Sequence, residues 1–407
     1  MTSALMILKS LLVLLLFCNV DGDTRIDFRP KNVTVYMGDT VNVSYTVLGI
    51  GNGTSCYLYS NDPHIADLKF SQTINSVNQT GVFILEGNFL GDTFISCRDP
   101  ISNDRSSESQ MYVRCLRPER VIDTIFTAST VVLVTIIYVN FGCAVEWGEL
   151  RKLLKRPIGP IIAFSGQFIL MPLVTFGLGF VLFPNDPAMR LGMFFVGVSP
   201  GGGASNIWTA ILDGNIDLSI LMSTVSTLAA FGMMPLWLFT LGGTIFADAN
   251  TEVPYFQIST YVMGLIFPLT LGYLIQRYLK KFGSFLKRIL KGFSSILILF
   301  IIVFAIVTNL YLFELFSWQI FVAGMVIPWM GYLAGYTVAK LLKQPYPDAL
   351  AIAIEIGILN TGIPIFLLRF ALDPLNADLT TVIPVSVAIM TPLPLMVFFV
   401  FRKIKQR

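Results

Sequence analysis

The sequence predicts an all-α membrane domain of about nine transmembrane helices, preceded by a small all-β extracellular domain. The chain has 407 residues, of which 54% are hydrophobic and 13% are charged, whereas soluble domains carry about 25% charged residues. Long apolar runs fill residues 121–401, and shorter runs with apolar residues at alternate positions lie within residues 23–120. These two patterns divide the chain into a membrane-embedded part and a water-exposed part.

Residues 1–22 have the features of a secretory signal peptide. Lys9 precedes a short apolar run over residues 11–17, and the small residues Val20 and Gly22 suit a cleavage site. The run is too short to cross a bilayer as a helix. An uncleaved membrane anchor is the alternative interpretation.

Residues 23–120 are expected to form a glycosylated, β-sandwich-like domain. Short candidate strands separated by Gly, Asn and Asp lie at 33–36, 41–45, 82–85 and 93–96, a pattern typical of a sandwich. Four acceptor sequences for N-glycosylation occur here and none follows residue 120. Behind a signal peptide, they indicate an extracellular location. The acceptors are Asn32, Asn42, Asn52 and Asn78.

The cysteines of this domain fit an oxidising compartment. Cys56 and Cys97 lie near the ends of two candidate strands, and we expect them to form a disulfide across the sandwich. Cys115 is left over beside the membrane domain, where it is either a free thiol or the link of a homodimer.

The long apolar runs predict the membrane spans and their orientation in the plasma membrane. We expect spans near 122–145, 158–182, 188–212, 217–246, 255–276, 289–311, 316–339, 348–372 and 376–401. An extracellular N-terminus then places the tail, residues 402–407, in the cytoplasm. Lys and Arg cluster in the loops that would be cytoplasmic, and the external loops carry only acidic charges, which is the positive-inside pattern. The short Asp213–Asp217 turn is the exception.

Glu355 is the charged residue that lies deepest inside a predicted span. An ionised carboxylate at that depth costs at least about 2.5–3.5 kcal/mol, so it normally pairs, takes up a proton or binds a cation. Gly357, Gly362 and Pro364 follow it and predict a broken helix, whose free carbonyls require a cavity or an ion. A protonated Glu with a structural role is the alternative.

A second broken helix is predicted at Pro200–Asn206, where one Pro and three Gly precede two polar residues. A plain loop between two short helices is the alternative. Ser219, Ser223 and Thr227 follow at intervals of four and stack on one helix face. Such hydroxyls often bond only to their own helix, but beside two breaks they are candidate oxygen ligands, as is the amide of Gln167. Two interrupted helices in separate halves of a chain indicate an inverted-repeat secondary transporter.

At these residues the chain resembles the sodium/bile acid symporter family, solute carrier family ten. The resemblance covers residues 120–401 and is strongest from Pro200 to Pro235 and at Glu355, Gly357 and Asn360. It also includes Arg156-Pro157, Gln167-Phe168 and Met171-Pro172. The long glycosylated N-terminus is similar to that of the orphan branch of the family. The family fold implies a core domain with two crossed broken helices and a panel domain that moves against it.

The resemblance implies two sodium sites and a substrate position. One sodium site would use Ser205, Asn206, Ser219, Ser223 and Glu355. The second would use Gln167, Glu355 and the backbone carbonyls of Ile356 and Ile358. Asn360 and Gly203 would lie near the substrate.

Two departures from the family pattern bear on this assignment. Leu359 stands directly before Asn360, where the family has Gln, so the second sodium site lacks a side-chain ligand. Gly203 stands where the family favours a hydroxyl residue near the substrate. Coupling to one sodium ion, to two, or to one sodium ion and a proton therefore stays open.

Together these features predict a sodium-coupled symporter of an organic anion, such as a bile-acid-like or sterol conjugate. A non-transporting receptor or scaffold, whose ectodomain binds a partner, is the alternative. The net charge of +3 gives no basis for nucleic-acid binding. The chain has a single histidine, His64, so metal sites built from several histidines and Ser-His catalytic triads are not expected. An enzyme is not expected.

The acceptor sequences and the loop charges predict an extracellular N-terminal domain and a cytoplasmic C-terminus. Glycosidase digestion should lower the apparent mass of the protein in steps, because several acceptors carry glycans. An epitope tag placed after Arg407 should bind antibody only in permeabilised cells. Staining of the tag on intact cells would contradict the predicted number of crossings.

Overall fold

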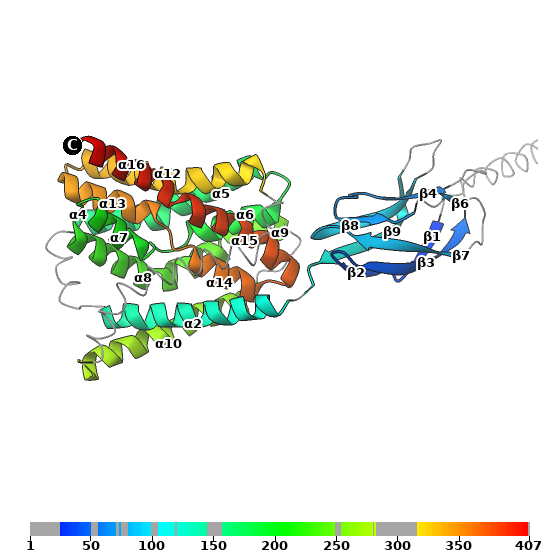
Figure 1. Cartoon of the computed structure of the whole chain (residues 1–407), viewed down its shortest axis with the longest axis horizontal. Helices are drawn as coiled ribbons and strands as arrows, with labels where there is room; N and C mark the ends of the chain where they lie inside the picture. The colour runs from blue at the N-terminus through cyan, green and yellow to red at the C-terminus, as the bar shows by residue number, and fades with distance from the viewer. Residues whose placement is uncertain are drawn as a thin grey trace, which may run out of the picture. The chain divides into compact units, whose positions relative to one another are not determined.

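The computed structural model of the chain describes residues 25–49, 56–70, 73–74, 80–98, 105–118, 120–144, 157–248, 254–279, 281 and 316–405. The chain divides into two compact units, Met1–Glu119 and Arg120–Arg407. Strands make up the first unit and helices the second (Figure 1). The predicted signal peptide and the acceptors Asn52 and Asn78 lie outside the described residues.

The first unit is a sandwich of two β-sheets. One sheet has the order β1 (Arg25–Arg29), β3 (Thr40–Gly49), β7 (Thr80–Gly87) and β5 (Ala66–Leu68). The other has the order β2 (Asn32–Tyr36), β9 (Arg105–Leu116), β8 (Gly91–Arg98), β4 (Cys56–Ser60) and β6 (Thr73–Ile74). Paired strands are antiparallel except β2 and β9, which are parallel. This is the strand order of an immunoglobulin-type sandwich.

Side chains alternate between the core and the surface along these strands. On β2, Val33 and Val35 are buried, whereas Asn32 and its alternate neighbours are exposed. On β3, Asn42 is exposed and Val43 is fully buried. The period of two follows from the pleat of a strand, which points successive side chains to opposite faces. The two described acceptor asparagines thus lie on the outer surface, where a glycan has room.

The cysteines correct one expectation and bear on an open alternative. Cys97 is buried and disulfide-bonded, but its strand β8 pairs with β4, the strand of Cys56. A bond between these two cysteines would join neighbouring strands of one sheet, so a disulfide across the two sheets is wrong, and the pairing itself stays a prediction. Cys115 is a free thiol that is fully buried in the sandwich core. Of the two alternatives for Cys115, the buried position favours the free thiol over a link between two chains.

The second unit consists of apolar helices. They are α2 (Val121–Ala144), α4 (Ile158–Ser165), a π-helical segment (Gly166–Leu170), α5 (Met171–Leu182), α6 (Pro187–Gly197), α7 (Ala204–Ile211), α8 (Ile216–Phe239), α9 (Leu241–Asp248), α10 (Tyr255–Tyr278), α12 (Trp318–Leu341), α13 (Tyr346–Gly357), α14 (Gly362–Ala371), α15 (Pro374–Met390) and α16 (Pro392–Lys405). Within the described residues, five helical segments are long and apolar enough to span a membrane. They are Ile158–Leu182, Ile216–Phe239, Tyr255–Tyr278, Trp318–Leu341 and Pro374–Lys405.

Most predicted spans coincide with these helices, and two are divided further. The span predicted near 289–311 lies outside the described residues. The span predicted at 217–246 is split at Thr240, whose backbone leaves the helical conformation after α8. The span predicted at 376–401 is divided between α15 and α16 at the single residue Thr391, which keeps helical backbone angles, so Pro374–Lys405 remains one candidate membrane span.

Small residues allow α12 to approach the broken helix α13 closely. A β-carbon at Gly331 would lie 2.7 Å from the Cα of Gly357, and one at Gly335 would lie 2.9 Å from the Cα of Ala353. Backbone stands in the way at both positions, so they accept only glycine. Membrane helices associate through such small-residue contacts. This contact holds the end of α13, where Glu355 lies.

Candidate functional site

The two predicted helix breaks lie against each other. One separates α6 from α7, and the other separates α13 from α14. The N–H of Gly202 donates to the carbonyl of Ile358 at 2.7 Å, and the N–H of Asn360 donates to the carbonyl of Pro200 at 2.9 Å. Inside a membrane an unpaired backbone group is costly. Each break therefore provides hydrogen-bond partners for backbone groups of the other. The two halves of the unit are joined where the broken helices cross.

Glycine at the first break makes room for the carboxylate of Glu355. A β-carbon at Gly201 would overlap the Oε1 atom of Glu355, and one at Gly202 would lie 3.0 Å from the carbonyl oxygen of Leu359. The N–H of Gly201 donates to the Oγ of Ser226 at 2.9 Å. The backbone of the break is thus held against the carboxyl group without a side chain in between.

Glu355 is almost fully buried, and its two oxygens differ in their surroundings. Oε2 accepts hydrogen bonds from the hydroxyls of Ser205 at 2.6 Å and Ser223 at 2.8 Å. Oε1 is buried and has no hydrogen-bond partner among the residues that the structure describes. A buried carboxylate with an unpaired oxygen is unstable unless a positive charge or a proton compensates it. The geometry thus calls for a cation or a proton beside Oε1.

Further oxygens from α7 and α8 extend this cluster. The Oδ1 of Asn206 accepts from the hydroxyl of Ser219 at 2.8 Å and from that of Ser223 at 3.4 Å. The hydroxyls of Ser205 and Ser223 are 3.2 Å apart. The structure therefore brings together all five residues of the first expected sodium site. They offer carboxylate, amide and hydroxyl oxygens, which are the donors that a hard cation prefers, so the residues fit a sodium ion.

Gln167 lies on the π-helical segment between α4 and α5. Its Nε2 donates to the carbonyl of Ser199 at 2.6 Å, and its Oε1 is buried without a hydrogen-bond partner among the described residues. A β-carbon at the neighbouring Gly166 would meet the side chain of Ile356. The extra residue in a π-helical turn commonly marks a functional position. Gln167 is thus a second buried oxygen, tied to the first break at Ser199.

The second expected sodium site is assembled only in part. The carbonyl oxygen of Ile358 already accepts from Gly202, although a carbonyl keeps a second lone pair. The backbone of Ile356 lies against Gly331. Leu359 is 4% exposed and belongs to an apolar cluster, so its side chain adds no oxygen. Among the residues that the structure describes, the site has two oxygens without a donor, on Gln167 and Glu355, and no further side-chain ligand.

Sequence reasoning misplaced one hydroxyl and missed two others. Thr227 donates to the backbone carbonyl of Ser223 in its own helix and does not extend the oxygen cluster. Thr209 receives a 3.3 Å hydrogen bond from Ser219, and its spacing of four from Ser205 on α7 could have identified it. Ser226 holds the backbone of the first break, a role that has no spacing signal.

The two expected substrate residues lie at the accessible edge of the crossing. Gly203 is exposed and Asn360 is partly exposed. The helices that start there, α7 after Gly203 and α14 after Thr361, have no side-chain hydrogen bond at their N-caps. Helix starts that no side chain caps provide partial positive charge.

Comparison with known proteins gives consistent relatives. Residues 130–314 match the sequence profile of the Sodium Bile acid symporter family. The P3 protein of Homo sapiens is 32% identical over 260 residues, which are 63% of this chain and 54% of that protein. The ileal sodium/bile acid cotransporter of Cricetulus griseus is 31% identical over 284 residues, 68% of this chain and 80% of that protein. The sodium-dependent organic anion transporter of Rattus norvegicus is 31% identical over 251 residues, 61% of this chain and 66% of that protein. The chain thus spans about half the length of the P3 protein.

Ser223 and Thr227 lie one turn apart on α8 and form a matched pair for a test of the oxygen cluster. We expect sodium chloride, compared with choline chloride, to raise the melting temperature of the purified protein, because a ligand that binds only the folded state stabilises it. Ser223→Ala removes a hydroxyl that contacts Glu355 and should weaken sodium affinity roughly tenfold, as expected for a hydrogen bond to a charged group.

Thr227→Ala is the control, because its hydroxyl bonds only to its own helix. It should leave the sodium-dependent shift unchanged. Equal sodium responses in the two variants would exclude the hydroxyl cluster from cation binding.

Proposed function

Because the chain belongs to the sodium/bile acid symporter family, we propose that it is a sodium-coupled symporter of an organic anion. The observation that supports this best is Glu355, a buried carboxylate at the crossing of two broken helices, one oxygen of which has no hydrogen-bond partner within the described part of the chain. A carboxylate in such a place suits reversible cation binding better than a purely structural role, because a structural carboxyl group would have hydrogen-bond partners for both of its oxygens.

The residues of the crossing can couple an ion to the position of the helices. Glu355 comes from α13, whereas Ser205 and Asn206 come from α7 and Ser223 from α8. Bound sodium would supply the positive charge that the carboxylate lacks. Oxygens from both broken helices would then share one ion, so the crossing is held more firmly when the ion is present. Asn360 follows directly on the second break and is positioned by the same contacts.

The accessible edge of the crossing suits an anionic group of the substrate. The uncapped starts of α7 and α14 offer N–H groups and the positive ends of their helix dipoles. The side chain of Asn360 and the open surface at Gly203 lie beside them. Relatives of this chain carry the names of bile acid and organic anion transporters, so a bile-acid-like or sterol conjugate is the substrate class we propose.

Alternating access requires that one group of helices moves against another. We assign α6, α7, α13 and α14 to the core, because they form the crossing, together with α8, whose Ser223 and Ser226 contact it. We assign α2 and α10 to the panel. These two run side by side (Figure 1) and pack so closely that β-carbons at Gly142 and Gly272 would overlap the backbone of the facing helix. The core would move as a rigid body, with the two breaks at its centre, in the manner of an inverted-repeat transporter.

Uptake into cells that express the full chain tests this function. Bile acid and steroid conjugates should be screened with sodium and with choline as the external cation. Uptake that requires sodium supports the symporter. If the purified protein binds sodium but no organic anion is taken up, the alternative of a receptor or scaffold, whose immunoglobulin-type ectodomain binds a partner, becomes the better account.

The apolar side chain of Leu359 predicts how many sodium ions are coupled to uptake. The prediction can be measured once a substrate is found. The second sodium site lacks a side-chain oxygen there, which should weaken it by roughly 1–3 kcal/mol, or about one to two decades in affinity. Uptake plotted against sodium concentration should therefore fit a Hill coefficient near one. Leu359→Gln should steepen the curve, and Leu359→Met, which fills the space without an oxygen, should not. A clearly sigmoidal curve in the unmodified protein would show that the second sodium site is functional despite Leu359. The proposal that the protein is a symporter would still stand.

A further inference from the structure

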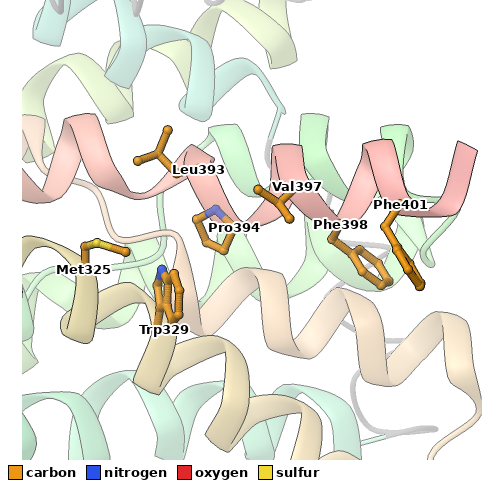
Figure 2. Close-up of a pocket in the computed structure, with 7 residues that line it drawn as sticks. All are labelled: Met325, Trp329, Leu393, Pro394, Val397, Phe398 and Phe401. Carbon is orange, nitrogen blue, oxygen red and sulfur yellow. The ribbon is translucent and has the colours of Figure 1, made fainter. Parts of the chain in front are cut away.

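An apolar groove of about 430 Å³ lies between α12 and α16, away from the crossing. Trp329 and Met325 line it from α12, and Leu393, Val397 and Phe401 are among the residues that line it from α16 (Figure 2). The groove has the volume of a small-molecule site. Val397 is 70% exposed and Phe401 is 64% exposed, so among the described residues the groove opens outward from the helical unit.

The groove extends over one half of the membrane. Trp329 lies near the middle of α12, between its start at Trp318 and its end at Leu341. Along α16 the lining residues run from Leu393 to Phe401, close to the end of the chain, over about 12 Å at the rise of an α-helix. Half of a hydrocarbon core is about 15 Å thick. The groove therefore reaches from the midplane to one membrane surface, the length available to a single acyl chain.

Basic side chains lie where the groove meets that surface. The last turn of α16 carries Arg402, Lys403 and Lys405. Arg402 is paired with Asp213 at 3.0 Å. Lys403 and Lys405 are exposed, and neither has an acidic partner within the part of the chain that the structure describes. Lys405 follows Phe401 by about one helical turn on the groove side, whereas Lys403 points to the opposite side of α16 and lies over the ring of Phe399. The apolar groove thus ends at one positive charge, that of Lys405, which is available to a ligand.

We propose that the groove between α12 and α16 binds an acyl chain of an anionic phospholipid, whose headgroup lies at Lys405. The argument rests on the orientation given above, in which the C-terminus is cytoplasmic, and it is independent of transport. Anionic lipids are concentrated in the cytoplasmic leaflet. Each lysine near that surface raises the affinity for an anionic lipid about fivefold. The apolar length and the terminal charge match the two ends of one such molecule.

Trp329 provides a probe inside the groove. The full-length protein is reconstituted into phosphatidylcholine vesicles that contain either phosphatidylserine with brominated acyl chains or the same fraction of brominated phosphatidylcholine. Bromine quenches tryptophan fluorescence on contact, and the difference between the unmodified protein and Trp329→Phe isolates the signal of Trp329. Brominated phosphatidylserine should quench Trp329 at a lower fraction than brominated phosphatidylcholine.

Charge variants show whether Lys405 causes this preference. Lys405→Gln should reduce the preference for phosphatidylserine about fivefold. Arg277→Gln with Lys281→Gln is the matched control, because these are exposed basic residues at and just beyond the end of α10. The control should keep the preference. Mass spectrometry of phospholipid retained through purification measures the same preference without the Trp329 variant.

Three results would overturn the proposal. The first is equal quenching by the two brominated lipids. The second is an equal preference in Lys405→Gln and in the control variant. The third is no quenching of Trp329 by either lipid, which would mean that protein and not lipid covers the groove.

Discussion

The carboxylate of Glu355 needs a compensating charge, and the architecture around it is built on that need. Two hydroxyls, from Ser205 and Ser223, saturate one of its oxygens and leave the other without a described donor. The first break has Gly201 at the point of contact, because a side chain there would displace the carboxyl group. An ion with hard-oxygen preference completes this arrangement better than a further hydrogen bond, since the surrounding side chains present oxygens rather than charged nitrogens. The two broken helices are thus linked through a group that is stable only when its charge is balanced.

The membrane helices and both breaks could be predicted from the sequence because their causes are local. A helix that crosses a bilayer needs a long apolar run, so α12 at Trp318–Leu341 lies within two residues of its predicted range. Pro and Gly destabilise a membrane helix, so the clusters of these residues near Gly201 and Gly357 predict the two breaks. Period-two alternation identified the sandwich for the same reason, since the pleat is a property of each strand alone.

Features that depend on contacts between distant segments could not be predicted from one sequence. The hydrogen bond from Asn360 to Pro200 joins parts of the chain that carry no shared local pattern. The π-helical turn at Gln167 is set by packing, since the residues of Gly166–Leu170 suit an α-helix equally well. The spacing of four that identified Ser223 also selected Thr227, although the latter bonds only to its own helix. The resemblance to a known family supplied the first oxygen cluster, and its departure at Leu359 matches a buried apolar position in the structure.

Equilibrium binding of radiolabelled sodium to the purified protein tests the role of Glu355 most directly, because it needs no knowledge of the substrate. Glu355→Gln keeps the volume of the side chain and removes its charge, so the variant should fold with the same helical content. The unmodified protein should bind sodium saturably, and Glu355→Gln should show no saturable binding. Unchanged sodium affinity in folded Glu355→Gln would mean that the carboxyl group is structural and that the ion binds elsewhere.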